Sequence, residues 1–245
     1  IIIMGTSYNP RIVTDGLVLC LDAANKRSYP GAGTTWSDLT KNNHNGTLVN
    51  NASFNSGNGG GIVLDGTDDY VEISDFESVD SPSDVSFSCT LKIDDLSTDR
   101  DILSKGPHND HPGTAILLWF DKAVGGGQQA GNSNAISVLS NGGGNLVWVS
   151  SANNIISADE IFTVDVTIDA STGKISLYKN AELLASYANS NYAGMPNNAY
   201  DFRLGVDGSG SKDLPGKFYF FRIYNKCLSA SEVQQNYLAT KGRFQ

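Results

Sequence analysis

The chain has 245 residues, a formal net charge of −9 and a pI of about 4.7. These values argue against nucleic acid as a partner, because phosphate binding needs a basic face and no run rich in Lys or Arg occurs. No apolar run approaches the roughly 20 residues needed to span a bilayer, so no membrane partner is expected. The 26 glycines and 18% of charged residues indicate a loop-rich all-β protein.

The N-terminal residues and the cysteines bear on the compartment. The first residues, IIIMGTSYNP, lack a charged start followed by a long apolar run, so we expect no signal peptide. We expect residues 1–14 to form a polar arm. Cys20, Cys89 and Cys227 are odd in number and form no CxxC motif, which we interpret as buried thiols made in a reducing compartment.

The first strand signal is the continuous apolar run at 16–22. Residues 25–46 then consist almost entirely of turn-forming residues. Two short strands are expected at 62–64 and 70–73, and Asp65–Gly66 between them predicts a hairpin, because glycine accepts the positive φ of such turns.

Strict alternation marks the strongest strand, VSFSCTLKI at 85–93, with its apolar residues inward and its Ser and Lys residues outward. A second hairpin is expected from 174–179 and 183–187, across Asn180–Glu182. Further strands are predicted at 102–104, 115–120, 135–139, 146–149, 162–168, 202–206 and 217–224.

One helix is predicted near the C-terminus. Ser229 and Glu232 have the spacing of a capping box, and Gly242 lies where a helix would stop. Elsewhere about a dozen strands follow one another without alternating helices. This pattern predicts an antiparallel two-sheet jelly-roll sandwich with one short C-terminal helix, formed by residues 15–245 as a single domain.

Four stretches together resemble a known fold family. They are DGLVLCLDAANKRSYPGAGTTWSDLTKNNHNG (15–46), IVLDGTDDYVEI (62–73), TIDASTGKISLYKN (167–180) and GKFYFFRIYNKCLSASEVQQNYLATKGR (216–243). Their order resembles the concanavalin A-like lectin/glucanase superfamily, in its laminin-G-like (LamG type 3) form, as found in virion proteins of tailed bacteriophages. The fold hosts lectins, glycosidases, adhesion modules and coat proteins, so it does not by itself define a function.

No catalytic set is evident. Glycosidases need two facing carboxylates, and strand alternation would place them at E-x-D-x-E spacing, which none of the five glutamates has. No G-x-S-x-G motif occurs, and the three histidines lie in turn-like segments. We therefore expect a protein that is not an enzyme.

Two segments could bind a metal. Asp65, Asp68 and Asp69 offer hard oxygen ligands that suit calcium, although the stretch lacks the EF-hand pattern. The alternative is a polar turn, with Asp65–Gly66 at the corner and a later aspartate accepting backbone N–H bonds. His108, Asp110 and His111 could bind a transition metal, but their Gly-Pro flanks favour an ordinary surface loop.

A sugar site would need an aromatic platform beside polar loops. Trp36 and Tyr29 are the candidate platform, with Tyr192, Tyr200 and the loops at 125–134 and 189–198 as further material. Packing at one end of the sandwich is the alternative for Trp36 and Tyr29, and exposure of Trp36 would decide between them. Trp119 and Trp148 lie in apolar strands and are expected in the core.

Two functions follow from the resemblance and the residues. One is a non-enzymatic structural protein of a phage virion, on the capsid or tail, which contacts other virion proteins or copies of itself. The other is a module that binds host-surface glycans with the assistance of calcium. No other cofactor is expected.

Overall fold

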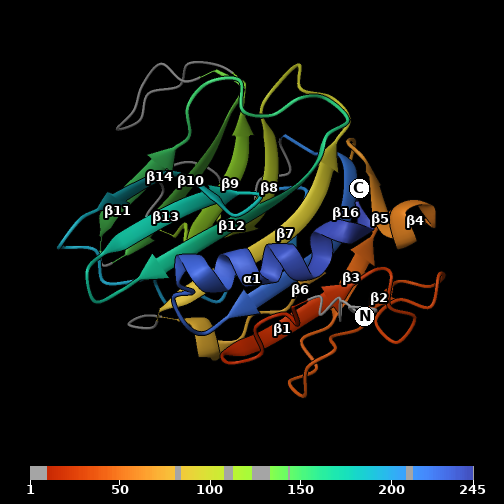
Figure 1. Cartoon of the computed structure of the whole chain (residues 1–245), viewed down its shortest axis with the longest axis horizontal. Helices are drawn as coiled ribbons and strands as arrows, with labels where there is room; N and C mark the ends of the chain where they lie inside the picture. Colours follow the sequence, from red (N-terminus) through yellow and green to blue (C-terminus); the bar gives the residue numbers. More distant parts are fainter. Residues whose placement is uncertain are drawn as a thin grey trace, which may run out of the picture.

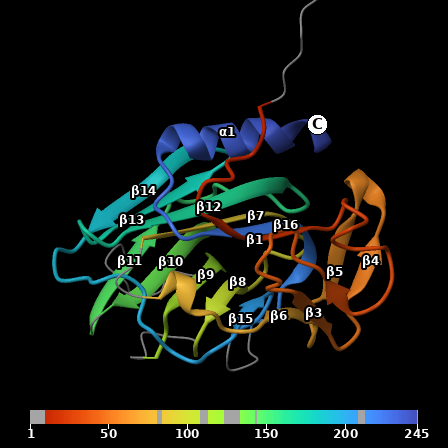
Figure 2. The same cartoon turned by 90° about the horizontal axis from the view of Figure 1, so that it is seen from below.

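The computed structural model describes residues 10–80, 84–107, 113–122, 133–142, 144–207 and 212–244. Two antiparallel eight-stranded sheets, A and B, pack face to face as a sandwich (Figure 1). Figure 2 shows them as two layers, with helix α1 (Ala230–Thr240) lying against sheet A on the side away from sheet B. The predicted all-β jelly-roll architecture with one short C-terminal helix is confirmed.

Sheet A has the order β14-β13-β12-β7-β16-β5-β4, and β1 also pairs with β16. Its strands are β1 (Leu17–Asp22), β4 (Ser53–Asn55), β5 (Gly61–Asp65), β7 (Val85–Ile93), β12 (Ile161–Asp169), β13 (Lys174–Lys179), β14 (Glu182–Ala188) and β16 (Pro215–Tyr224). The long strands β7 and β16 lie in the middle, so the sheet is built around the alternating segment and the C-terminal apolar run.

Sheet B has the order β11-β10-β9-β8-β15-β6-β3-β2. Its strands are β2 (Thr35–Trp36), β3 (Gly46–Val49), β6 (Tyr70–Ile73), β8 (Arg100–Lys105), β9 (Ile116–Asp121), β10 (Ala135–Gly142), β11 (Asn145–Ser150) and β15 (Phe202–Leu204). Three short 3-10 helices complete the described elements: η1 (Gly57–Gly59), η2 (Glu77–Val79) and η3 (Lys241–Arg243).

The main core lies between the sheets and follows strand alternation. In β7, Phe87 and Leu91 point inward and are at most 2% exposed, and Phe202 of β15 packs against Phe87 from the other sheet. Trp36 also belongs to this cluster. Cys20 and Cys89 are buried and Cys227 is partly buried, and all three are free thiols.

The hairpin predicted at Asp65–Gly66 does not form. Strand β5 pairs with β4 and β16 in sheet A, whereas β6 pairs with β3 and β15 in sheet B. The glycine does adopt φ of +80°, and a Cβ there would meet Pro215 at 2.7 Å. The local turn prediction was therefore correct, but the turn carries the chain from one sheet to the other.

The second predicted hairpin is confirmed, because β13 pairs with β14. Asn180 and Ala181 between them have φ of +51° and +67°, as a type I′ turn requires. Strand β14 is the edge of sheet A, and its outward Leu183 is 52% exposed.

Helix α1 begins with the predicted capping box, in which Ser229 accepts from the backbone of Glu232 and the Glu232 side chain accepts from the backbone of Ser229. The helix ends at Thr240 and continues as η3. Gly242 follows directly after the C-cap Lys241, where the prediction places the stop, but it lies inside η3 without a positive φ, so the stop does not depend on a left-handed glycine. Within the described residues, no helix is long and apolar enough to cross a membrane.

The outer face of sheet A is polar but covered. Its central row runs from Arg222 of β16 through Ser88 of β7 to Asp165 of β12, as the strand register shows, and all three residues are at most 3% exposed. Burial raises the pKa of Asp165 to about 7, against the opposing effects of Ser88 and Arg222. We call the row of Arg222, Ser88 and Asp165 the covered face.

The N-terminal segment helps to cover this face. Val13 is 7% exposed; its N–H donates to Asn236 Oδ1 of α1 at 2.8 Å and its carbonyl accepts from Tyr224 at 3.2 Å. Figure 2 shows this red segment beside α1. Residues just before β1 are thus held against the helix side of the molecule.

Candidate functional site

The acidic turn between β5 and β6 brings its three predicted residues together. One carboxylate oxygen from each of Asp65, Asp68 and Asp69 lies within 4.8 Å of the others. Asp69 is 2% exposed and accepts backbone N–H bonds from Asn51 at 2.8 Å and from Asp65 at 3.1 Å. The expectation that a later aspartate accepts backbone bonds is therefore confirmed.

The same turn fits an oxygen-seeking cation in its donor set. Burial raises the pKa of Asp213, and the nearby charges of Asp207 and Asp68 raise it further. The loop before β16 therefore lies within electrostatic range of the turn. This concentration of carboxylates matches the hard ligands that calcium prefers, while Asp65 and Asp69 already serve the turn itself.

The predicted aromatic platform is buried. Trp36 is 0% exposed and Tyr29 is 3% exposed. Tyr29 donates its hydroxyl to Gly33 O at 2.7 Å and its ring packs against Phe54 with centroids 5.3 Å apart. Neither ring offers a face to a ligand in this structure, and their burial favours the packing alternative.

Two other predicted candidates fall largely outside the described residues. The metal candidate at His108, Asp110 and His111 lies there, as does most of the loop at 125–134. Tyr192, from the sugar-site material, is 2% exposed, and burial raises the pKa of its hydroxyl strongly.

Trp119 and Trp148 pack outside the main core. They lie on the outer face of sheet B in a small apolar cluster with Leu117 and Leu139, and their rings meet edge to face at 5.2 Å. Trp119 is buried as expected, but it faces away from sheet A because the inward positions of β9 are Ile116, Leu118 and Phe120.

A shallow hollow opens on the same outer face, beside β8 and β15. It has a volume of about 110 Å³ and is lined by Ser104, Gly106, Tyr200, Asp201 and Arg203. Strand alternation explains it, because Phe202 points inward and so turns Arg203 outward, opposite Ser104. We call it the β8–β15 hollow.

Hydrogen bonds orient the charged side chains of the β8–β15 hollow, and its tyrosine ring is exposed. Arg203 Nε donates to Glu72 Oε2 at 3.2 Å, and its guanidinium lies 5.2 Å from the centre of the Tyr70 ring. Asp201 Oδ1 accepts from the backbone N–H of Asp75 at 3.0 Å. Tyr200 is 48% exposed. An exposed ring therefore stands beside a guanidinium and a carboxylate.

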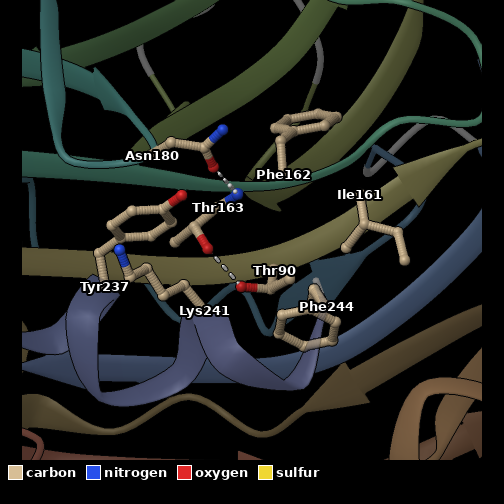
Figure 3. A pocket seen from close by; sticks show the side chains of 8 residues that line it. All are labelled: Thr90, Ile161, Phe162, Thr163, Asn180, Tyr237, Lys241 and Phe244. Carbon is tan, nitrogen blue, oxygen red and sulfur yellow. Dashed lines mark hydrogen bonds between the residues drawn. The ribbon is translucent and has the colours of Figure 1, made fainter. Parts of the chain in front are cut away.

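Two further hollows lie on the helix side. One, of about 120 Å³, lies between α1 and sheet A (Figure 3). There the hydroxyls of Thr90 and Thr163 bond to each other at 2.6 Å, and Thr163 N–H donates to Asn180 Oδ1 at 2.9 Å. Tyr237 and Lys241 line its helix side (Figure 3). The polar groups of Thr90, Thr163 and Asn180 thus bond to one another, so nothing in this hollow points to a ligand.

The other hollow on the helix side is larger, at about 520 Å³. It lies between the N-terminal segment and the loop after Leu39, and it is lined by Ile12, Thr14, Leu17, Cys20, Leu39, Thr40, Lys41 and Asn42. Its lining mixes aliphatic and neutral polar groups with one lysine and contains no aromatic side chain.

The sequence pointed weakly to the β8–β15 hollow. Tyr200 was among the aromatic candidates, and it stands directly before a short strand. Nothing local indicated that Ser104 and Arg203, 99 positions apart in the numbering, are strand neighbours; that follows only from the pairing of β8 with β15.

Comparison with known proteins defines the class to which this two-sheet sandwich belongs. A family model described as the concanavalin A-like lectin/glucanases superfamily matches residues 65–234, more than half of the chain. The chain belongs to this superfamily, in its laminin-G-like group. No curated protein sequence matches it.

Solved structures show the same fold at low identity. The binding domain of Paraclostridial Mosquitocidal Protein 1 is 16% identical, with a TM-score of 0.69 over 91% of this chain and 52% of that one. The receptor-binding domain of botulinum neurotoxin type G is 14% identical, with a TM-score of 0.65 over 91% and 51%. The chain thus spans about half the length of these two toxin structures.

A third neighbour matches over almost its entire length. Domain 4 of AbnA, an extracellular arabinanase of family GH43 from Geobacillus stearothermophilus, in complex with arabinotriose, is 19% identical. Its TM-score is 0.63 over 91% of this chain and 98% of that one. At these identities the likeness establishes the fold alone.

Proposed function

We propose that this protein is a carbohydrate-binding domain that recognises host-surface glycans through the β8–β15 hollow. The observation that carries the proposal is the exposed ring of Tyr200 beside Asp201 and Arg203. Support also comes from the fold neighbour that was solved with arabinotriose. The volume of about 110 Å³ lies well below the roughly 300 Å³ at which drug-sized pockets begin, so only a small part of a glycan would enter.

Each side chain has a distinct task in this proposal. The apolar face of a sugar ring packs on Tyr200, because an aromatic ring offers a large contact area with little conformational freedom to lose. Arg203 donates to sugar hydroxyls and Asp201 accepts from them, and hydrogen bonds to charged groups are the stronger kind. No bond is broken, and the protein acts by binding.

We propose that a calcium ion stabilises the turn between β5 and β6. Asp65, Asp68 and Asp69 would hold it, and its charge would fix the turn that joins the two sheets. Since β6, which follows the turn, pairs with β15 of the hollow, fixing the turn steadies one wall of the site.

A glycan array tests the proposal directly. The wild-type protein should bind a defined subset of glycans in calcium-containing buffer, and Tyr200→Ala should lower affinity at least about tenfold, as expected for about 1.4 kcal/mol. Tyr187→Ala is the matched control, because Tyr187 is also exposed, at 37%, but lies on the edge strand β14. Absence of any glycan signal, or equal losses in both variants, would contradict the proposal.

A second proposal is a structural role in a tailed-bacteriophage virion, through contacts with other virion proteins or with copies of this chain. It is supported by the side of the molecule on which the first described residues lie. That segment is anchored at Val13 beside α1, on the side away from the outer face of sheet B (Figure 2). A tether there would leave the β8–β15 hollow facing outward, so both roles are compatible.

The virion role is tested by incorporation into particles. Removing residues 1–9 spares the Val13 anchor and should reduce incorporation if the arm is the tether. A truncated protein that enters particles at the wild-type level would contradict a tethering arm, whatever the outcome of the glycan array.

A further inference from the structure

A lysine is buried inside the sandwich, near the end of β8. Lys105 is 0% exposed and faces inward, because its strand partners Ile116 and Phe202 are core residues. Its Nζ lies 5.3 Å from the centre of the Phe202 ring. Burying an ammonium group costs several kcal/mol unless it is well paired, so the groups that contact Nζ decide how this charge is accommodated.

Two carboxylates and one carboxamide surround this amine. Nζ lies 2.7 Å from Asp75 Oδ1 and 4.0 Å from Asp80 Oδ1. It also donates to the side-chain Oδ1 of Asn198 at 2.8 Å and to the backbone carbonyl of Asn198 at 2.7 Å. A buried primary amine is thus in direct contact with a carboxamide.

The carboxamide of Asn198 is fixed at both ends. Its Nδ2 donates to Gly113 O at 2.7 Å, and its Oδ1 also accepts from the backbone N–H of Tyr200 at 3.3 Å. The carbonyl carbon is one bond from an oxygen that the Tyr200 N–H polarises independently of the attacking amine. Donors aimed at such an oxygen stabilise the negative charge of a tetrahedral intermediate.

Asp80 supplies a proton carrier. It is 5% exposed, and neither of its carboxylate oxygens has a hydrogen-bond partner among the described residues. Burial raises its pKa, and the charges of Asp75 and Glu77 add to this effect while Lys105 opposes it. A raised pKa makes this carboxylate a better proton acceptor than an ordinary aspartate.

We propose that Lys105 and Asn198 form an intramolecular isopeptide bond. Nζ transfers one proton to Asp80, and the neutral amine attacks Cγ of Asn198 to form a C–N bond. The tetrahedral intermediate collapses as the Cγ–Nδ2 bond breaks, and Nδ2 leaves as an ammonium ion after it has received the second Nζ proton and the proton held by Asp80. Asp80 thereby returns to its carboxylate. The balance is one ammonium group plus one carboxamide giving one secondary amide and one ammonium ion, without an oxidant or cofactor, so the neutral chain loses the mass of one ammonia.

Asp75 acts as a positioning residue in this reaction. Its carboxylate pairs with Nζ and thereby keeps the amine in contact with the carboxamide. Fixing two groups at contact distance removes much of the entropic barrier to reaction. The bond would join the end of β8 to the loop before β15, 93 residues further along the chain.

Intact mass spectrometry of the denatured full chain tests the proposal. The wild-type mass should be lower than the sequence mass by one ammonia molecule. A tryptic digest should contain a branched peptide joining Lys105 to Asn198, because trypsin does not cleave after an acylated lysine. A full sequence mass, with both residues in separate linear peptides, would overturn the proposal even if no variant folds.

Variants separate the bond from other losses of ammonia. Lys105→Met and Asn198→Ala should each restore the mass calculated from the sequence, and Asp80→Asn should leave the bond unformed. Lys92→Met is the matched control, since the ion-pair partners of Lys92 in the described part of the chain are the carboxylates of Asp94 and Asp159, and it should retain the loss. Persistence of the loss in Lys105→Met would overturn the bond, and full linkage in Asp80→Asn would overturn the role of Asp80.

Discussion

The two outer faces of the sandwich use polar strand positions in opposite ways. On sheet A, Ser88, Asp165 and Arg222 lie beneath α1 and are at most 3% exposed. On sheet B, the side chains of Glu72 and Arg203 pair while remaining 30% and 31% exposed. Alternation assigned both sets to the outside, but the helix closes one of them off. The helix therefore determines which of the two polar faces is buried and which one meets solvent.

The largest expected effect tests whether α1 seals the covered face. Leu228, which is 2% exposed, packs with Tyr224 and Val233 where the chain enters the helix. Leu228→Ala should lower the free energy of unfolding by about 2–5 kcal/mol, the usual cost of a buried cavity. Denaturant titration measures it. Leu183→Ala, at an exposed position of the same sheet, is the control and should change stability by less than about 0.5 kcal/mol. Equal effects would contradict the difference between covered and exposed positions.

A pH dependence should come from Asp165. Burial raises its folded pKa to about 7 from an unfolded value near 3.9, so the folded state binds this proton more tightly. Its contribution to stability is fully present below about pH 4 and is lost as the pH rises through about 7, by up to roughly 4 kcal/mol. Unfolding of wild type and Asp165→Asn from pH 4 to 8 measures it. A variant with the same pH slope as wild type would contradict a buried, proton-binding Asp165.

The turn that joins the two sheets should respond to calcium. If it binds, the ion stabilises the folded chain by about 1.4 kcal/mol at a free concentration ten times its Kd. Thermal unfolding with calcium and with chelator measures this, and Asp68→Asn should reduce the difference. Asp15→Asn removes an exposed carboxylate that lies 50 positions before Asp65 in the sequence, and it should leave the difference unchanged. A wild-type protein that unfolds identically in both buffers would remove calcium from the proposal.

The smallest expected effect on stability lies on the outer face of sheet B. Arg203→Met should change the free energy of unfolding by less than about 1 kcal/mol, because its ion pair with Glu72 is partly solvated. The same substitution should weaken glycan binding about tenfold or more if Arg203 donates to the sugar. A large loss of stability with unchanged binding would reverse the roles assigned to the two faces.

Much of the fold could be predicted because it depends on local pattern. The alternation at Val85–Ile93 sets which residues enter the core, the Ser229–Glu232 spacing begins α1, and the turn at Asn180–Ala181 joins two paired strands. Each signal is contained within a few residues, where backbone geometry and side-chain chemistry decide the outcome.

What the sequence did not reveal depends on long-range pairing. Asp65–Gly66 shows that the chain turns, but the partners of β5 and β6 decide that they lie in different sheets. The indole of Trp36 suits a sugar platform, yet its 0% exposure results from packing by distant strands. In the same way, Tyr200 becomes part of a hollow only because β15 lies beside β8.

The loop that carries Asn198 also carries Tyr200 and Asp201. Its contacts with Lys105, Gly113 and Asp75 fasten it at several points, with or without a covalent link. Ordering a flexible loop normally subtracts from affinity, and here that entropy is lost during folding, before the proposed glycan ligand binds. A pre-ordered loop should make association rates largely independent of loop motion. Differences in affinity between glycans should then lie mainly in their dissociation rates.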